Sequence, residues 1–331
     1  MKKLEILIPQ YKEDESVVCK LLNSIAMQQG INLKKDVGII IVNDGTDVIL
    51  SDDFLKGYDL DITYLKNEKN MGISFTRNKA LDAATADYVM FCDDDDMFYD
   101  SLAIHTIFER INEMDEFGRL GFDVFVPLFK EEILDENGRV KYITHKNDIT
   151  FNHGKVYNRF YLISNNIRFS TEVTFHEDVY FNALALTCSE RIVRADDCYY
   201  LWCNNMNSTT RSNPDFLVDN VEIQVKCYSK LIDEFLKRNM LSNAKANAAS
   251  GLYKMYYESQ TGKYLRRPDR LEVLEKCTKE FYLKYKKLYE ICSEEQKIKI
   301  LKAMKCDYLE LGILFEKITF EDWIKKIEAL R

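Results

Sequence analysis

The sequence contains little proline and little glycine, with 4 and 12 residues respectively among 331. Collagen-like and low-complexity classes are therefore excluded. Long apolar runs are missing as well, since the longest aliphatic stretch is Ile39 to Val42, whereas a membrane-spanning helix needs about 20 apolar residues. Residues 1–15 are too charged for a secretory signal peptide. We therefore expect a globular protein without a transmembrane segment that is not exported.

Motifs in which cysteine or histidine binds zinc are also missing. The nine cysteines contain no Cys-x-x-Cys pair, and the four histidines are spread singly. His176 and Glu177 lack the second histidine of a zincin helix, because Tyr180 occupies its position. We expect reduced thiols in a cytoplasmic protein, structural or surface histidines, and no zinc site.

Glycine-rich nucleotide loops are a third absence. No Gly-x-Gly-x-x-Gly follows a predicted strand, and Gly154-Lys155-Val156 is not the end of a Walker loop. Neither a Rossmann cofactor site nor an NTPase site is therefore expected. A nucleotidyltransferase is disfavoured for a related reason, because Pro9 to Glu13 offers no glycine for a triphosphate loop near the first strand.

Length and charge both indicate two domains. The 331 residues, 46% apolar and 30% charged, can bury a sizeable core. The net charge is −8, but residues 215–331 carry 23 basic and 19 acidic groups, which leaves −12 for residues 1–214. Residues 226–305 hold 19 basic against 10 acidic side chains. This surplus either attracts polyanions or belongs to a solvated helical surface.

The first ninety residues alternate short apolar runs with amphipathic segments, which is typical of βαβ units and a largely parallel sheet. The predicted strands cover residues 4–8, 37–42, 61–65, 88–92, 122–129 and 199–203, with a hairpin near 135–138. Helices are predicted near residues 102–114, 155–165 and 174–186. Beyond Pro214 the periodicity is helical. We expect an α/β domain over residues 1–214 and a helical domain over residues 215–331.

Acidic residues follow three of these strands. Glu13, Asp44 and the run Asp93 to Asp96 stand after the first, second and fourth strands, at the edge of the sheet where open α/β proteins bind ligands. Neighbouring carboxylates repel unless a cation lies between them, so a divalent metal is expected. It is not held by an EF-hand, because Phe98 and Ile104 replace that loop's glycine and glutamate. The alternative is an exposed acidic turn.

Five short motifs occur in order along residues 3–212: Ile6–Glu13, Val42–Thr46, Asn70–Asn78, Tyr88–Asp96 and Glu177-Asp178. Together they resemble the inverting family 2 glycosyltransferases, which have the GT-A fold. The resemblance implies an α/β fold with a mostly parallel sheet flanked by helices, a nucleotide-sugar donor and a Mn²⁺ or Mg²⁺ cofactor.

The resemblance also assigns roles to residues. It implies that Asp178 is the general base and that Asp95 and Asp93 bind the metal. Asp44 is expected to accept a hydrogen bond from uracil, and Gly72 and Arg77 to lie near the nucleotide sugar. The full donor-binding set is then Pro9, Tyr11, Glu13, Asp44, Asn70, Gly72, Arg77, Asp93, Asp94, Glu177 and Ser208.

The sequence departs from the family pattern at four places, one of which is the proline that is replaced around Tyr99 and Asp100. Asp94 stands where the family usually has serine, and Asn43 stands for the first aspartate of the second motif. The stretch from Tyr200 to Thr210 lacks a metal-binding histidine and the usual arginine. Here Asn205 or Asn207 could supply an oxygen to the metal, and Ser208 and Thr210 could contact the diphosphate.

These observations predict a metal-dependent, inverting enzyme that moves one sugar from UDP-hexose or UDP-N-acetylhexosamine to a hydroxyl group, on a surface or wall glycan. In-line displacement of a nucleoside diphosphate needs both a metal and a carboxylate base. Two alternatives stay open: another polyanionic acceptor, such as modified nucleic acid, and a non-catalytic nucleotide-sugar-binding protein. The helical region is expected to bind the acceptor, touch the inner face of the membrane, or form oligomers.

Overall fold

The structure, a computed structural model, describes residues 2–205, 208, 212–213, 215–310 and 318–330. The chain divides into two compact units, Met1–Asn205 and Met206–Arg331. The predicted domain boundary at residue 214 lies nine residues after Asn205, where the first unit ends. Each unit is described by itself below.

The first unit is built on a nine-stranded mixed sheet with the order β3-β2-β1-β4-β8-β6-β9-β5, and β7 pairs with β6. The strands are β1 Leu4–Gln10, β2 Val37–Asn43, β3 Ile62–Lys66, β4 Tyr88–Phe91, β5 Met97–Phe98, β6 Val124–Leu134, β7 Val140–His145, β8 Val156–Asn158 and β9 Ile192–Trp202. Strands β3, β2, β1 and β4 are parallel. The predicted parallel arrangement thus covers the first four strands, while β8 joins β4 and β6 antiparallel.

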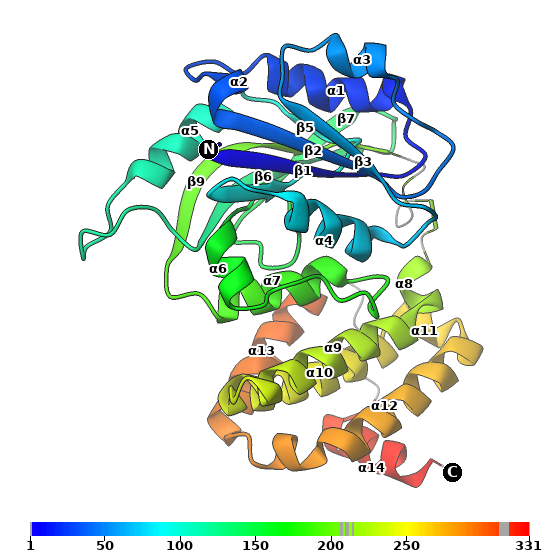
Figure 1. Ribbon diagram of the computed structural model, residues 1–331. Helices are drawn as coiled ribbons and strands as arrows, with labels where there is room; N and C mark the ends of the chain where they lie inside the picture. Colours follow the sequence, from blue (N-terminus) through cyan, green and yellow to red (C-terminus); the bar gives the residue numbers. More distant parts are fainter. Residues whose placement is uncertain (1, 206–207, 209–211, 214, 311–317, 331) are drawn as a thin grey trace. The chain divides into compact units, whose positions relative to one another are not determined.

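Helices cover both faces of the parallel strands, with α1 and α3 on one side and α4, α6 and α7 on the other (Figure 1). The helices of this unit are α1 Glu15–Ala26, α2 Leu33–Asp36, α3 Asp52–Lys56, α4 Ile73–Ala83, α5 Ala103–Asn112, α6 Arg159–Ser164 and α7 Glu177–Thr187. Every residue of β1 and β2 is buried. Strands that are covered on both faces read as continuous apolar runs, which is why the sequence predicts them clearly.

The helix predicted over residues 155–165 is wrong in its first part. Residues Val156–Asn158 form β8, and helix α6 begins only at Arg159. Val156 and Tyr157 are fully buried, and this strand bridges β4 and β6. Asn158 then caps α6 by accepting a hydrogen bond from the Tyr161 N–H. Pairing with distant strands overrides the local helical pattern here.

The second unit is helical, as the sequence predicts. Its helices are α8 Phe216–Asp219, α9 Val221–Lys237, α10 Leu241–Ser259, α11 Gly262–Leu265, α12 Pro268–Glu290, α13 Glu294–Glu310 and α14 Phe320–Ala329. Helix α10 contacts α9, α12 and α13. Small residues allow this approach, because a Cβ at Gly251 would lie 2.7 Å from the Phe281 ring. Among the described residues, no helix is both long and apolar enough to cross a bilayer.

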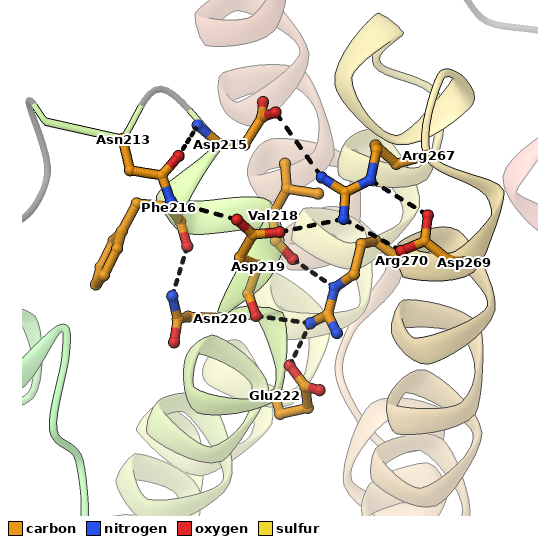
Figure 2. Close-up of polar contacts among 10 residues, drawn as sticks. All are labelled: Asn213, Asp215, Phe216, Val218, Asp219, Asn220, Glu222, Arg267, Asp269 and Arg270. Carbon is orange, nitrogen blue, oxygen red and sulfur yellow. Dashed lines mark hydrogen bonds and ion pairs between the residues drawn. The ribbon is translucent and has the colours of Figure 1, made fainter.

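Two arginines of the second unit connect α8 and the start of α9 to the start of α12 (Figure 2). Arg267 pairs with Asp219 at 3.3 Å and with Asp269 at 3.1 Å. Arg270 donates to the Asp219 carbonyl at 2.9 Å and pairs with Glu222 at 2.6 Å. Part of the basic surplus of residues 226–305 is therefore neutralised within the unit.

A glycine determines the turn after β2. Gly45 has φ of +69°, and a Cβ there would lie 2.1 Å from the carbonyl carbon of Lys69. Gly138 has a similar φ of +71° but nothing within 4 Å of a Cβ. A side chain at Gly138 would be unfavourable only because of the left-handed backbone conformation, whereas one at Gly45 would also clash with the backbone of Lys69.

We therefore expect Gly45→Ala to destabilise the protein by about 3 kcal/mol and Gly138→Ala by about 1 kcal/mol. Urea unfolding followed by circular dichroism measures both values. Equal losses for the two variants would show that the turn tolerates a side chain at residue 45.

Candidate active site

The carboxyl ends of β1, β2 and β4 meet at one edge of the sheet. Strand β1 lies between β2 and β4, so the strand order reverses at β1, and open α/β sheets bind ligands at the carboxyl edge of such a point. The loops that follow these strands carry Glu13, Asp44 and Asp93 to Asp96. The structure thus brings together the acidic residues that the sequence singles out.

Buried side-chain amides support the first two loops. Asn43 donates through Nδ2 to Gln10 Oε1 at 2.5 Å and to the Val48 carbonyl at 2.9 Å. Gln10 donates through Nε2 to the carbonyls of Glu13 and Val48. Both amides are fully buried. An aspartate at residue 43 could not donate these bonds, which gives a physical reason for the asparagine that replaces the family's aspartate.

Asp44 holds the loop that leads into α4. Its carboxylate accepts hydrogen bonds from Asn67 Nδ2 at 2.9 Å, the Met71 N–H at 2.8 Å and the Gly72 N–H at 2.9 Å. Gly72 has φ of +86°, with nothing within 4 Å of a Cβ. Asn70 is exposed and accepts a second bond from the Gly72 N–H. Asp44 therefore positions Gly72, and its expected contact with uracil stays a prediction.

Arg77 lies buried between two carboxylates, and the sequence did not predict this position. Its guanidinium bonds to Asp93 Oδ1 at 2.7 Å and to Glu177 Oε1 at 2.8 Å, and it stacks over the Phe169 ring. Burial alone would lower the pKa of Arg77, but the charges of Asp93 and Glu177 outweigh it and raise that pKa. Helices α4 and α7 are thus joined through the Arg77 side chain, although Arg77 and Glu177 are 100 residues apart in sequence.

The four consecutive aspartates have different environments. Asp93 bonds to Arg77, and Asp95 accepts from Asn205 Nδ2 at 2.8 Å. Asp96 is fully buried and accepts from the Tyr200 hydroxyl at 2.5 Å and the Cys203 N–H at 2.9 Å. Asp94 is 8% exposed, and its Oδ2 has no hydrogen-bond partner among the described residues. Asp96 therefore anchors β9, while Asp94 leaves an oxygen atom unused.

The carboxylates fit a divalent cation. Burial, followed by the charges of Asp95, Asp93 and Glu13, raises the pKa of Asp94 well above its ordinary value. Burial and the charge of Asp93 also raise the pKa of Asp95. A cation would relieve this repulsion, and a set of carboxylate oxygens suits Mg²⁺ or Mn²⁺.

His153 is a further residue near the aspartates, where the sequence predicts only a structural or surface histidine. One ligand atom each from His153, Asp93 and Asp96 lie within 4.8 Å of one another. Burial lowers the pKa of His153 to about 4, so its imidazole is neutral, as a metal ligand must be. The oxygens of Asp96 already accept bonds from Tyr200 and Cys203. Asp95 and Asp93 therefore stay the predicted metal ligands, and His153 lies near Asp93.

Glu177 and Asp178 open helix α7. His176 precedes them with φ of +64°. Asp178 accepts a hydrogen bond from the Val179 N–H at 2.7 Å. Burial and the charge of Glu177 raise the pKa of Asp178 to about 8, although Arg77 opposes the shift. A carboxylate with this pKa can act as a general base near neutral pH.

The remaining predicted residues lie at the ends of the loops. Tyr11 is 43% exposed, Pro9 pairs with Val42 inside the sheet, and Glu13 is half-buried. Asn205 turns its amide nitrogen toward Asp95 and Glu13, and the role of its oxygen as a metal ligand stays a prediction. Ser208 belongs to the second unit, and Asn207 and Thr210 lie outside the described residues.

A cavity of about 920 Å³ lies elsewhere in this unit. Lys3, Asp36 and Leu60, which precede β1, β2 and β3, are among its lining residues. It is therefore at the amino ends of the parallel strands, at the opposite edge from the carboxylates. Side chains of both charges line it, including Lys34 and Asp59, which pair with each other at 2.6 Å.

Sequence comparison relates the chain to glycosyltransferases. Residues 5–118 match the model of the family described as "Glycosyl transferase family 2". The uncharacterized glycosyltransferase EpsJ of Bacillus subtilis is 28% identical over 227 residues, which cover 62% of each chain. The poly(ribitol-phosphate) beta-N-acetylglucosaminyltransferase TarS of Staphylococcus aureus is 26% identical over 305 residues, covering 83% of this chain and 51% of TarS. The chain thus spans less than two thirds of either relative.

Solved structures show the same fold. The crystal structure of S. aureus TarS 1–349 has a TM-score of 0.54 at 17% identity and covers 92% of both chains. The same fragment in complex with UDP-GlcNAc has a TM-score of 0.52 at 19% identity. The chain therefore shares the GT-A fold of TarS 1–349, with a helical region after the sheet. Over residues 5–118 the chain is thus similar to glycosyl transferase family 2.

The buried position of Arg77 leads to a stability prediction. We expect Arg77→Met to destabilise the protein by about 3 kcal/mol or more at pH 7, because Asp93 and Glu177 would stay buried without a counter-charge. Arg168→Met is the matched control, because Arg168 pairs at 2.9 Å with Asp82, which is 64% exposed, and should cost about 1 kcal/mol or less. Urea unfolding compares the two. Similar losses would contradict the assignment of Arg77 as the essential counter-charge.

Proposed function

We propose that this chain is a metal-dependent, inverting glycosyltransferase that moves one sugar from a UDP-linked donor to a hydroxyl group of a surface or wall glycan. One observation carries the proposal. Buried Arg77 bonds both to Asp93, in the acidic run after β4, and to Glu177, next to Asp178. The carboxylates for the leaving diphosphate and the carboxylate for the acceptor therefore belong to one site.

The donor is proposed to be UDP-hexose or UDP-N-acetylhexosamine. The complex of TarS with UDP-GlcNAc supports this choice, because TarS shares the fold over 92% of this chain. The exposed ring of Tyr11 is suited to stack on the base. Asp94 offers an unused oxygen to a donor hydroxyl. Asp44 and Arg77 would act on the donor mainly by placing Gly72 and Asp93.

The proposed reaction is a single displacement. The acceptor oxygen attacks the anomeric carbon, its proton passes to Asp178, and the bond from that carbon to the diphosphate breaks with its electron pair on the leaving UDP. A base without a covalent nucleophile implies inversion at the anomeric carbon. A divalent cation held by Asp95 and Asp93 would neutralise charge on the departing diphosphate.

The proposed acceptor is anionic. TarS is named for poly(ribitol-phosphate), and residues 226–305 of this chain hold 19 basic against 10 acidic groups. Ion pairs within the helical unit use some of these charges, and the others favour a polyanion. Such a substrate is consistent with a cytoplasmic enzyme at the inner face of the membrane. Modified nucleic acid is a second polyanionic acceptor class, and oligomer formation is a further role for this unit.

A donor panel tests the enzyme class. Purified protein is incubated with Mn²⁺ and a series of nucleotide sugars, and the released nucleoside diphosphate is measured. We expect slow release from one UDP-sugar, which names the donor. Binding without release would favour the non-catalytic alternative, and neither binding nor release with any donor would contradict the proposal.

Substitutions should separate base from metal ligand. Asp178→Asn should lower transfer by about 10²- to 10⁴-fold, because it removes the proton acceptor, while leaving the metal-dependent affinity for UDP unchanged. Asp95→Asn should lose that affinity as well. Calorimetric titration of UDP with and without Mn²⁺, combined with a transfer assay, distinguishes the two. If both variants behave alike, the division of roles is wrong.

The pH dependence follows from the pKa of about 8 at Asp178. Asp178 accepts a proton only when ionised, so kcat/KM should rise with pH and level off above about 8. Initial rates between pH 5.5 and 9.5, in buffers of constant ionic strength, measure this profile. A profile that is already flat above pH 6 would contradict Asp178 as the base.

A further inference from the structure

The fully buried side chain of Asn182 holds the helical turn that carries Asp178. Asn182 follows Asp178 by four residues, one helical turn later in α7. Its Nδ2 lies 3.0 Å from the Asp178 carbonyl, 2.7 Å from the Thr150 carbonyl and 3.0 Å from Asn152 Oδ1. Its Oδ1 accepts from the Tyr157 hydroxyl at 2.7 Å. This one side chain therefore joins the Asp178 turn to the loop before β8 and to β8 itself.

The partners of Asn182 are themselves firmly held. Tyr157 is fully buried in β8, which pairs with β4, the strand that leads to the aspartate run. The loop before β8 is closed by Asp148, which accepts from the Thr150 N–H, the Phe151 N–H and Lys155 Nζ, each at 2.8 to 3.0 Å. Asn182 therefore connects α7 to a support that is fixed relative to β4.

An aromatic cluster reinforces the same connection. Phe181, beside Asn182, stacks on Phe169 with ring centroids 4.1 Å apart and contacts the rings of Phe91 and Tyr157. Phe91 ends β4, two residues before Asp93. These contacts are apolar and tolerate small shifts, whereas the hydrogen bonds of Asn182 are directional. The side-chain amide of Asn182 thus fixes the orientation of the Asp178 turn relative to these packed rings.

We propose that Asn182, held by Tyr157, is a positioning residue that keeps the proposed base Asp178 at its working distance from the donor site. This inference rests on the proposed function for its catalytic consequence, but not for its structural one. A displacement of about 1 Å can lower a reaction rate by about 10²-fold. Loss of this anchor should therefore lower kcat without weakening donor binding.

Two tyrosine-to-phenylalanine substitutions provide a matched test. Tyr157→Phe removes the hydrogen bond to Asn182, whereas Tyr161→Phe removes a buried hydrogen bond to the Ala185 carbonyl, farther along α7. We expect Tyr157→Phe to lower kcat for transfer about 10-fold or more with the donor KM within about twofold. Tyr161→Phe should change kcat by less than about twofold. Equal effects on kcat would overturn the inference.

Hydrogen exchange tests the anchor independently of activity. Tyr157→Phe should speed amide exchange of residues 180–183 about fivefold and leave residues 185–188 unchanged, and Tyr161→Phe should do the reverse. If this pattern appears in a protein that transfers no sugar, the anchor stands and the proposed function fails. If exchange at residues 180–183 is unchanged by Tyr157→Phe, the inference fails whatever the activity.

Discussion

The site depends on the buried guanidinium of Arg77, which pairs with two carboxylates and leaves the neighbouring carboxylates without a positive partner in the part of the chain that the structure describes. Arg77 bonds to Asp93 and Glu177, and burial leaves Asp94, Asp95 and Asp178 with raised pKa values. Ionised side chains in such a place repel each other unless a further cation enters. This lack of positive charge beside the buried carboxylates has two consequences. A divalent cation at the end of β4 would relieve the repulsion, and the raised pKa of Asp178 makes this carboxylate basic enough to take a proton.

Hydrogen bonds and aromatic contacts around the site keep these mutually repelling carboxylates in place. Buried amides at Gln10 and Asn43 hold the first two loops, and Asp44 holds the loop that begins α4. Asn182 and Phe181 of α7, together with the rings of Phe91 and Phe169, connect the Asp178 turn to β4. Neutral amides are suited to this work because they fix geometry without adding charge to an already acidic site.

Sequence reasoning succeeded where the signal is local. Strands β1, β2 and β4 are continuous apolar runs, and the acidic residues that follow them are found together at one sheet edge. It failed where distant segments decide the outcome. Val156–Asn158 is a strand only because β4 and β6 lie on either side. The burial of Arg77 and the position of His153 follow from contacts with residues far along the chain, and the sequence gives no sign that Asn182 supports Asp178.

The most direct test is the titration of Asp178 itself. Carboxyl ¹³C NMR of the free protein, with the resonance assigned by comparison with Asp178→Asn, gives the midpoint for this one side chain. We expect a midpoint near 8, because burial and the charge of Glu177 raise the pKa of Asp178 more than Arg77 lowers it. A midpoint near about 3.9, the value of an exposed aspartate, would show that Asp178 is compensated or solvated and would contradict its role as the base.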